Sequence, residues 1–221
     1  MIVQGTEAWH AERLGKVTAS RMADVCARTK SGWGAGRKNY MAELVAERLT
    51  GTRAEGFTNA AMQWGTDQEP EARVAYEFYR DATVFEVGFV PHPSIADTGA
   101  SPDGLVGDDG LVEIKAPNTA THIETLLGGT VPEKYVLQMQ WQLNCTGRQW
   151  CDFASYDPRL PESMRLFVQR VHRDETQIAA LEKDVVEFLT ELRETVAKLR
   201  AKYEPAPATD LPYLAQLRMA G

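Results

Sequence analysis

The chain has 221 residues, of which 43% are hydrophobic, and this is enough apolar content for one compact domain with a single core. It contains no run of 18 apolar residues and no leader in which charged residues precede an apolar stretch, so we expect a soluble, cytoplasmic protein without membrane contact. The formal net charge of −7 argues against a non-specific nucleic-acid coat protein, and three scattered cysteines argue against a disulfide framework, a zinc site or an iron–sulfur cluster.

Hydrophobic periodicity predicts helices at residues 20–28, 38–49, 59–79, 119–127, 132–144 and from 175 to about 203. Runs of β-branched and aromatic residues predict strands at 83–90, 104–106, 111–114, 149–156 and 164–172. Pro70 is expected to kink or restart the third helix near Thr66. This order predicts an α/β fold in which helices flank a mixed central β-sheet, in a single domain of residues 1–203. Residues 204–221 are predicted to be an extended tail with a short docking segment.

The stretch from Ser101 to Lys115 constrains function most tightly. Two apolar-rich segments flank a Gly-Asp-Asp-Gly turn at 107–110, which is a strong β-hairpin signal. The turn brings Asp103 back toward Glu113, and Lys115 shares a face with Glu113 because side chains alternate along a strand. Two carboxylates suit a hard cation such as Mg²⁺, and a lysine beside that ion can act on a water molecule or support charge on phosphate. This is the Asp…Glu-x-Lys arrangement of metal-dependent nucleases.

A plainer interpretation of the same residues is that Asp-Gly pairs form turns and that Glu-x-Lys is solvated charge on an exposed strand. The apolar residues Leu111, Val112 and Ile114 argue against it, because they indicate a central strand. A carboxylate beside a buried strand needs a partner, such as a metal ion. The sequence therefore favours the metal site.

Two further groups of polar residues have more than one interpretation. Glu69 and Arg73 are four apart on one helical face, so they form either a surface ion pair or a place where a third carboxylate reaches the same metal. Gln138 and Gln142 also share a helical face, with Gln140 pointing elsewhere. Their amides are expected either to contact a phosphate or bases, or to cover an exposed helix face, and the sequence leaves both alternatives open.

Several blocks of sequence carry a family resemblance, namely residues 4–20, Trp64-Gly65 with Glu69 and Ala72-Arg73, and residues 100–105, 111–117, 127–129, 138–140 and 156–159. In these blocks, from about residue 4 to residue 200, the chain resembles the YqaJ-type viral recombinase exonucleases, the family of bacteriophage lambda exonuclease. The resemblance implies a restriction-endonuclease-like fold of the PD-(D/E)xK superfamily. It also implies a Mg²⁺-dependent 5′-to-3′ exonuclease that degrades one strand of duplex DNA from its end, releases mononucleotides and leaves a 3′ overhang.

The resemblance also implies roles for individual residues. It assigns two metal ions, Mg²⁺ or in its place Mn²⁺, to Asp103, Glu113, the Ile114 carbonyl and Glu69. Lys115 would act on the attacking water. It assigns a pocket for the 5′-phosphate to Arg13, Ser20, Ser101 and Gln138, and a guanidinium with hydroxyl donors suits that dianion. Lys30 falls where the family places a basic minor-groove contact, although lysine here replaces arginine.

The family resemblance further implies a ring-shaped homotrimer threaded by duplex DNA, working in a bacterial host cell with a single-strand annealing recombinase. Lys30, Arg37 and Lys38 are expected to give an acidic protein a positive channel. One alternative is a structure-specific or restriction-type endonuclease of the same fold, which would not need the 5′-phosphate pocket. Another is an inactive DNA-end-binding module, which the intact Asp…Glu-x-Lys set disfavours.

Overall fold

The computed structural model describes residues 2–53 and 60–204 of the chain. In chain order its elements are α1 (Glu7–Arg13), β1 (Val17–Thr18), a 3₁₀ turn (Ala19–Arg21), α2 (Met22–Val25), β2 (Arg28–Thr29), β3 (Gly32–Trp33), α3 (Ala35–Thr50), α4 (Ala60–Arg80), β4 (Val84–Phe85), β5 (Val90–Pro91), β6 (Thr98–Ala100), β7 (Gly104–Val106), β8 (Gly110–Lys115), α5 (Thr119–Gly128), α6 (Glu133–Thr146), β9 (Trp150–Tyr156), a 3₁₀ turn (Glu162–Met164), β10 (Leu166–His172) and α7 (Glu175–Tyr203). Within the described ranges, no helix combines the length and apolar character needed to cross a membrane.

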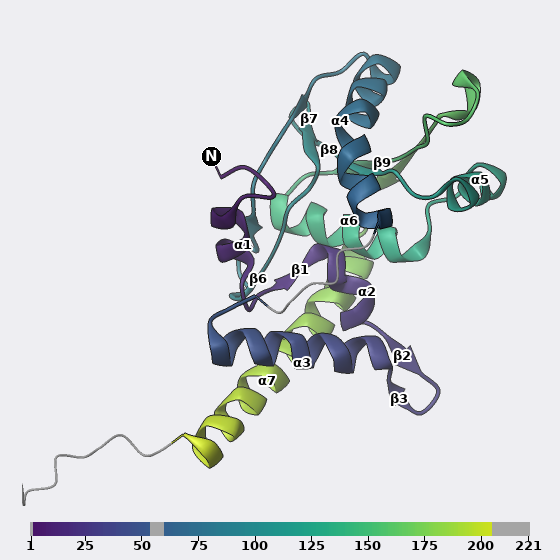
Figure 1. The fold of residues 1–221 in the computed structure, drawn as a ribbon. Helices are drawn as coiled ribbons and strands as arrows, with labels where there is room; N and C mark the ends of the chain where they lie inside the picture. The colour runs from purple at the N-terminus through teal and green to yellow at the C-terminus, as the bar shows by residue number, and fades with distance from the viewer. Residues whose placement is uncertain (1, 54–59, 205–221) are drawn as a thin grey trace, which may run out of the picture.

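The largest sheet of the described residues has five strands in the order β10-β9-β8-β7-β4, and its strands β7, β8 and β9 are labelled in Figure 1. β8 and β9 are parallel and the other neighbours are antiparallel, which confirms the predicted mixed sheet. β8 is the middle strand, as its apolar residues indicated. A smaller sheet, β1-β6-β5, and the β2–β3 hairpin complete the strand pairing of the described residues.

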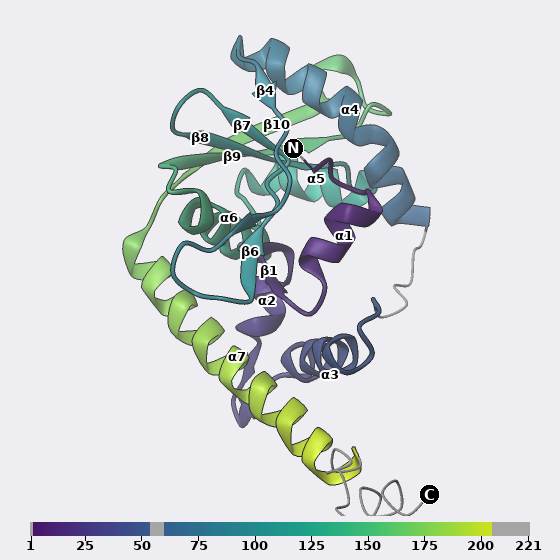
Figure 2. The same ribbon diagram turned by 90° about the vertical axis from the view of Figure 1, so that its left-hand side faces the viewer.

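Helices α4 and α6 lie on opposite sides of the five-stranded sheet (Figure 2). On the α4 side, Tyr76 packs in a buried cluster with Val112 and Ile114. On the α6 side, Leu143 packs in a separate buried cluster with Leu111. The alternation of these residues along β8 places Glu113 and Lys115 on the face that α6 covers.

The long helix α7 packs against α3 through an apolar stripe. Phe188 and Leu192 of α7 share a buried core with Tyr40 and Leu44 of α3. The helix begins at Asp174, whose side chain accepts hydrogen bonds from the backbone N–H groups of the two residues after Glu175, a typical helix cap. The predicted C-terminal helix is therefore confirmed, and it closes the core on the side away from α4.

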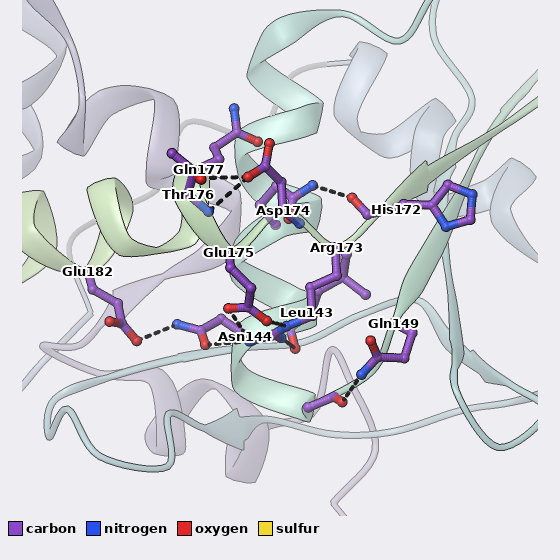
Figure 3. A network of polar contacts seen from close by, with 12 residues as sticks. Leu143, Asn144, Gln149, His172, Arg173, Asp174, Glu175, Thr176, Gln177 and Glu182 are labelled. Atoms are coloured by element: carbon purple, nitrogen blue, oxygen red, sulfur yellow. Dashed lines mark hydrogen bonds and ion pairs between the residues drawn. The ribbon is translucent and has the colours of Figure 1, made fainter.

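A polar network joins α6 to the start of α7 (Figure 3). The Gln140 amide donates to the carbonyl of His172 at 2.7 Å and accepts from the backbone N–H of Asp174 at 3.0 Å. The Asn144 amide donates to Glu182 at 2.9 Å. This face of α6 is thus occupied by structural contacts.

The N-terminal third of the chain differs from the predicted elements. In place of a helix at 20–28, the chain forms a 3₁₀ turn and the four-residue α2, and β2 begins at Arg28. The Ser20 hydroxyl lies 3.4 Å from the Thr18 hydroxyl, and no side chain caps α2. Helix α1 was not predicted at all, and Thr6 caps it by accepting from the Trp9 N–H at 3.3 Å.

The single strand predicted at 83–90 is wrong. The segment contains β4 and the start of β5, which belong to different sheets. Between them the chain pairs with the N-terminal segment, because the Gln4 amide donates to the Val87 carbonyl at 2.8 Å. A Cβ at Gly88 would lie 2.5 Å from the Ile2 carbonyl oxygen, so the close approach requires glycine. Such long-range contacts are invisible to a local pattern.

The restart of the third helix expected near Thr66 is also wrong, because α4 runs unbroken through Pro70. The turn after the proline is fixed to the sheet by Ala72 and Tyr76, both fully buried. The predicted helices at 38–49, 119–127 and 132–144 are confirmed within a few residues. The predicted tail and docking segment lie, beyond residue 204, outside the described residues.

Candidate active site

The β7–β8 hairpin forms as predicted and sets the position of Asp103. Gly104 pairs with Val112, and the same register places Asp103 opposite Glu113. The Asp103 carboxylate accepts a hydrogen bond from the Ile114 N–H at 2.6 Å, which fixes the end of the hairpin. One oxygen of Asp103, Oδ1, has no hydrogen-bond donor among the described residues and remains available.

The turn of this hairpin is held from outside. The Arg148 guanidinium donates to the carbonyls of Gly107 at 2.9 Å and Gly110 at 2.7 Å. The Trp150 indole N–H donates to Asp109 at 3.0 Å, and its ring lies so close to Gly110 that a Cβ there would be 2.0 Å away. These contacts keep the two strands, and hence Asp103 and Glu113, in register.

Glu113 is fully buried, and polar groups surround both its oxygens. The Gln138 amide donates to Oε1 at 2.6 Å and the Gln142 amide donates to Oε2 at 2.5 Å. Lys115 forms an ion pair with Oε1. The structure therefore brings Asp103, Glu113 and Lys115 together as predicted.

Glu69 fits both interpretations that the sequence left open. Its carboxylate pairs with Arg73 at 2.8 Å, and Arg73 also pairs with Glu86. Glu69 and Asp103 nevertheless line the same cavity of about 600 Å³. The ion pair does not remove Glu69 from the site, because the Glu69 carboxylate still raises the pKa of Asp103.

The electrostatics of these groups are unbalanced. Burial, then the neighbouring Glu113 carboxylate, raise the pKa of Asp103 well above its ordinary value. Burial would lower the pKa of Lys115, but Glu113 and Asp103 outweigh it and raise that pKa, so Lys115 stays an ammonium. The three carboxylates have two cations as partners, because Lys115 pairs with Glu113 and Arg73 pairs with Glu69. A divalent cation would relieve the repulsion that remains between the carboxylates.

The donor set fits a magnesium ion. In the described part of the chain, no three His, Cys, Asp or Glu side chains are grouped closely enough to form a complete metal site. Mg²⁺ does not require one, because it binds through one or two carboxylates together with water and substrate phosphates. Counted from two lone pairs on each oxygen, both oxygens of Asp103 and Oε2 of Glu113 have acceptor capacity left, whereas Oε1 of Glu113 already has two partners.

A second cavity, of about 310 Å³, contains Arg13 and Ser20. Arg13 donates to the Ser101 hydroxyl at 3.0 Å, and its guanidinium stacks 4.2 Å from the centre of the Trp9 ring. The Trp9 indole N–H also donates to Ser101, at 3.0 Å. Burial, opposed by Tyr40 and assisted by Arg53, lowers the pKa of Arg13 to about 10, so it stays charged at neutral pH. Three of the four predicted phosphate residues thus lie together.

The two cavities adjoin. Trp9, His10 and Arg53 line both of them. Sequence reasoning missed this junction because it missed α1, where Trp9 and Arg13 are four residues apart and so lie on one face.

Three basic or polar residues lie elsewhere than predicted. Gln138 does not line the Arg13 cavity, because its amide is bound to Glu113. Lys30 is exposed in the turn of the β2–β3 hairpin and lines neither cavity. Arg37 is 2% exposed, donates to the Val25 carbonyl and pairs with Glu191, so it contributes no free charge to a channel.

Comparisons with known proteins identify a family and related structures. Residues 8–149 match the YqaJ-like viral recombinase domain. The chain is 56% identical to the alkaline exonuclease LHK-Exo from Laribacter hongkongensis, over 89% of this chain and 97% of that one, with a TM-score of 0.83. The structure of LHK-Exo in complex with dAMP matches over the same shares at 56% identity, with a TM-score of 0.84.

A phage-related exonuclease from Haemophilus somnus 129PT shares the fold alone, at 14% identity over 83% of this chain and 96% of that one, with a TM-score of 0.67. No curated protein sequence matches. These neighbours have the restriction-endonuclease-like fold, and the mixed sheet with flanking helices has the same architecture. The chain therefore belongs to the YqaJ-like viral recombinase family and is a nuclease.

Proposed function

We propose that the protein is a Mg²⁺-dependent exonuclease that degrades one strand of duplex DNA in the 5′-to-3′ direction, releases mononucleotides and leaves a 3′ overhang. The observation that carries this proposal is the pair of adjoining cavities, one with Arg13 and Ser20 and the other with Asp103 and Glu69. A terminal phosphate bound at Arg13 would direct the next phosphodiester toward Asp103. The complex of LHK-Exo with dAMP, a mononucleotide, is consistent with such a product.

The proposed ligands of two Mg²⁺ ions, or of Mn²⁺ in their place, are the carboxylates of Asp103, Glu113 and Glu69 with the Ile114 carbonyl. When bound, such ions polarise a phosphoryl oxygen and lower the pKa of bound water. Lys115 is held as an ammonium by Glu113, so its proposed role is to donate a hydrogen bond that orients the attacking water or a phosphate oxygen. The Ile114 N–H holds Asp103 through Oδ2, so Oδ1 is the oxygen that we propose as a metal ligand.

Arg13 is the residue that we propose to bind the terminal phosphate of the DNA. Its guanidinium is positioned by Trp9 and Ser101, and no carboxylate among the described residues forms an ion pair with it. A terminal phosphate would supply the missing anion, through short hydrogen bonds of the kind that guanidinium groups form with phosphate. An endonuclease would gain nothing from such a pocket.

The decisive experiment uses end-labelled linear duplexes with 5′-phosphate or 5′-hydroxyl ends, in Mg²⁺, in Mn²⁺ and in EDTA. We expect mononucleotide release in either metal, none in EDTA, faster digestion of phosphorylated ends and no attack on covalently closed circular duplex. Cleavage of the closed circle would instead establish an endonuclease of the same fold. Binding to ends without cleavage in either metal would establish a binding module.

We propose in addition a ring-shaped homotrimer that encloses the duplex and works with a single-strand annealing recombinase on the 3′ overhang. A ring needs favourable potential only in its channel, so the outer surface of a protein with net charge −7 can stay acidic. Lys30 and Lys38 are exposed and remain candidates for the channel, whereas Arg37 is excluded by its burial. Light scattering should give a mass of about three chains, and a monomer at working concentration would overturn the ring alone.

A further inference from the structure

The two amides that hold Glu113 are not equivalent. Oε1 accepts from Gln138 and also pairs with Lys115, whereas Oε2 accepts from Gln142 alone. An ionised carboxylate oxygen has about two acceptor positions. Oε1 is therefore saturated, and Oε2 keeps one position open beside the hydrogen bond from Gln142.

Gln142 is itself fixed. It is fully buried on the face of α6 that covers the sheet. Its carbonyl oxygen lies 3.9 Å from the thiol of Cys151, a weak donor on the neighbouring strand β9. This contact favours the amide orientation in which the NH₂ group, and not the oxygen, faces Glu113. The reversed orientation would place two acceptors against each other.

The chemistry of the amide also matters. A lysine or arginine at position 142 would neutralise the Glu113 carboxylate and weaken its attraction for a cation. A neutral amide fixes the direction of Oε2 and leaves the negative charge in place. Gln138 acts on the oxygen that Lys115 already holds, so its loss would leave that oxygen with a donor.

We propose that Gln142 is a positioning residue that fixes the metal-binding oxygen of Glu113, Oε2, and so sets the affinity of the site for a divalent cation. This rests on the proposed metal-dependent nuclease function. It assigns a task to Gln142 that differs from the phosphate or base contact considered from the sequence.

The test measures Mg²⁺ binding by isothermal titration calorimetry, on the full chain without DNA, for Gln142→Met, Gln138→Met and Gln140→Met. Each variant replaces a buried glutamine of α6 by methionine, which is also unbranched but has no amide. Gln140 serves as the matched control, because its amide joins α6 to the start of α7 and touches no site residue. We expect Mg²⁺ affinity to fall about 10- to 100-fold in Gln142→Met, by less in Gln138→Met and not measurably in Gln140→Met.

Activity provides a second readout of the same proposal. Because the positioning residue acts through the metal, raising the Mg²⁺ concentration should restore most of the maximal rate of Gln142→Met, so that the half-saturating Mg²⁺ concentration changes more than kcat. If Gln142→Met does not fold, Gln142→Asn is measured instead, since its amide is one methylene too short to reach Glu113. The same loss of affinity is expected there.

Two results would overturn the role of Gln142. One is Mg²⁺ affinity within twofold of wild type in the folded Gln142 variant, and the other is a loss in Gln138→Met at least as large as in Gln142→Met. Failure of the proposed function looks different, because the wild-type chain would then cleave DNA in EDTA or would not cleave it in either metal.

Discussion

Two fully buried carboxylates lie side by side in the central sheet and have opposite surroundings. Asp152 on β9 is paired in register with Val112, the residue before Glu113 on β8. Asp152 is bound by Arg170 at 2.8 and 3.0 Å, by Arg80 at 3.0 Å and by the Tyr76 hydroxyl at 2.9 Å.

Glu113, on the opposite face, is contacted by one ammonium and two neutral amides. Burial and the carboxylates of Glu113 and Glu69 together raise the pKa of the neighbouring Asp103. Two guanidinium groups leave Asp152 with no net attraction for a cation, so we expect it to act in the fold and not in metal binding. Around Glu113, the carboxylates of Asp103, Glu113 and Glu69 outnumber the cations Lys115 and Arg73, which supports the proposed metal site. Burial alone does not distinguish these two carboxylates, whereas the balance of charge around each of them does, and an imbalance supports a functional role.

The largest expected effect comes from removing members of the unbalanced cluster. Asp103→Ala and Lys115→Ala should each lower the rate of DNA digestion by about 100- to 10,000-fold, because these groups act mainly on the transition state. Circular dichroism should show an intact fold for both. Near-normal Mg²⁺-dependent digestion by either variant would contradict the assignment of Asp103 and Lys115 to the active site.

Removing the balanced carboxylate should have the converse outcome. Asp152→Asn leaves Arg80 and Arg170 without an anion and should lower the free energy of unfolding by about 3 kcal/mol. The guanidinium groups are about one-third exposed and can turn toward water, which limits the loss. Denaturant unfolding measures it, and the rate per folded molecule at saturating Mg²⁺ should stay within about threefold, as expected for a group outside the chemistry. A selective loss of activity without destabilisation would contradict the comparison.

Arg13 extends the comparison to cations, since Arg170 has a carboxylate partner and Arg13 has none among the described residues. Arg13→Ala should lower the preference for 5′-phosphorylated over 5′-hydroxyl ends by about 10- to 100-fold, because hydrogen bonds to charged groups contribute about 1.5–3 kcal/mol. Initial rates on the two substrates give the ratio. If the variant keeps the wild-type preference, Arg13 does not bind the 5′-phosphate.

The smallest expected effect is on stability as a function of pH in EDTA. The pKa of Asp103 is raised in the folded chain, so its contribution to stability is fully present below the unfolded pKa and is lost as pH rises through the folded pKa. Metal-free wild type should therefore lose stability relative to Asp103→Asn as pH increases from about 4 toward 8, above the unfolded aspartate pKa of about 3.9. Thermal unfolding of the two proteins in parallel gives the difference. Saturating Mg²⁺ should reverse it, because the ion binds the wild-type carboxylate more tightly than the amide and so stabilises wild type more. A constant difference across this range would mean that Asp103 is not perturbed.

The site could be predicted only in part from local patterns. The spacing from Asp103 to Lys115 predicted the hairpin and the shared face, because turn chemistry and side-chain alternation are local properties. The same reasoning placed Gln138 and Gln142 on one helical face but not on Glu113, because the partner of a helical face lies far away in the sequence. The resemblance assigned Gln138 to the phosphate pocket, but its amide is bound to Glu113, and the local pattern could not show this.

Taken by itself, the sequence determined the α/β class, the mixed sheet with β8 at its centre, the Asp…Glu-x-Lys hairpin and the family, since each depends on periodicity, turn residues or ordered motif blocks. The tertiary structure decided which polar groups meet. Packing of α6 on β8 brought two amides to Glu113, packing of α1 beside β6 brought Arg13 to Ser101, and burial against Val25 and Glu191 withdrew Arg37 from solvent. Hydrogen bonds and burial between distant segments depend on how whole elements pack, and no local pattern encodes that packing.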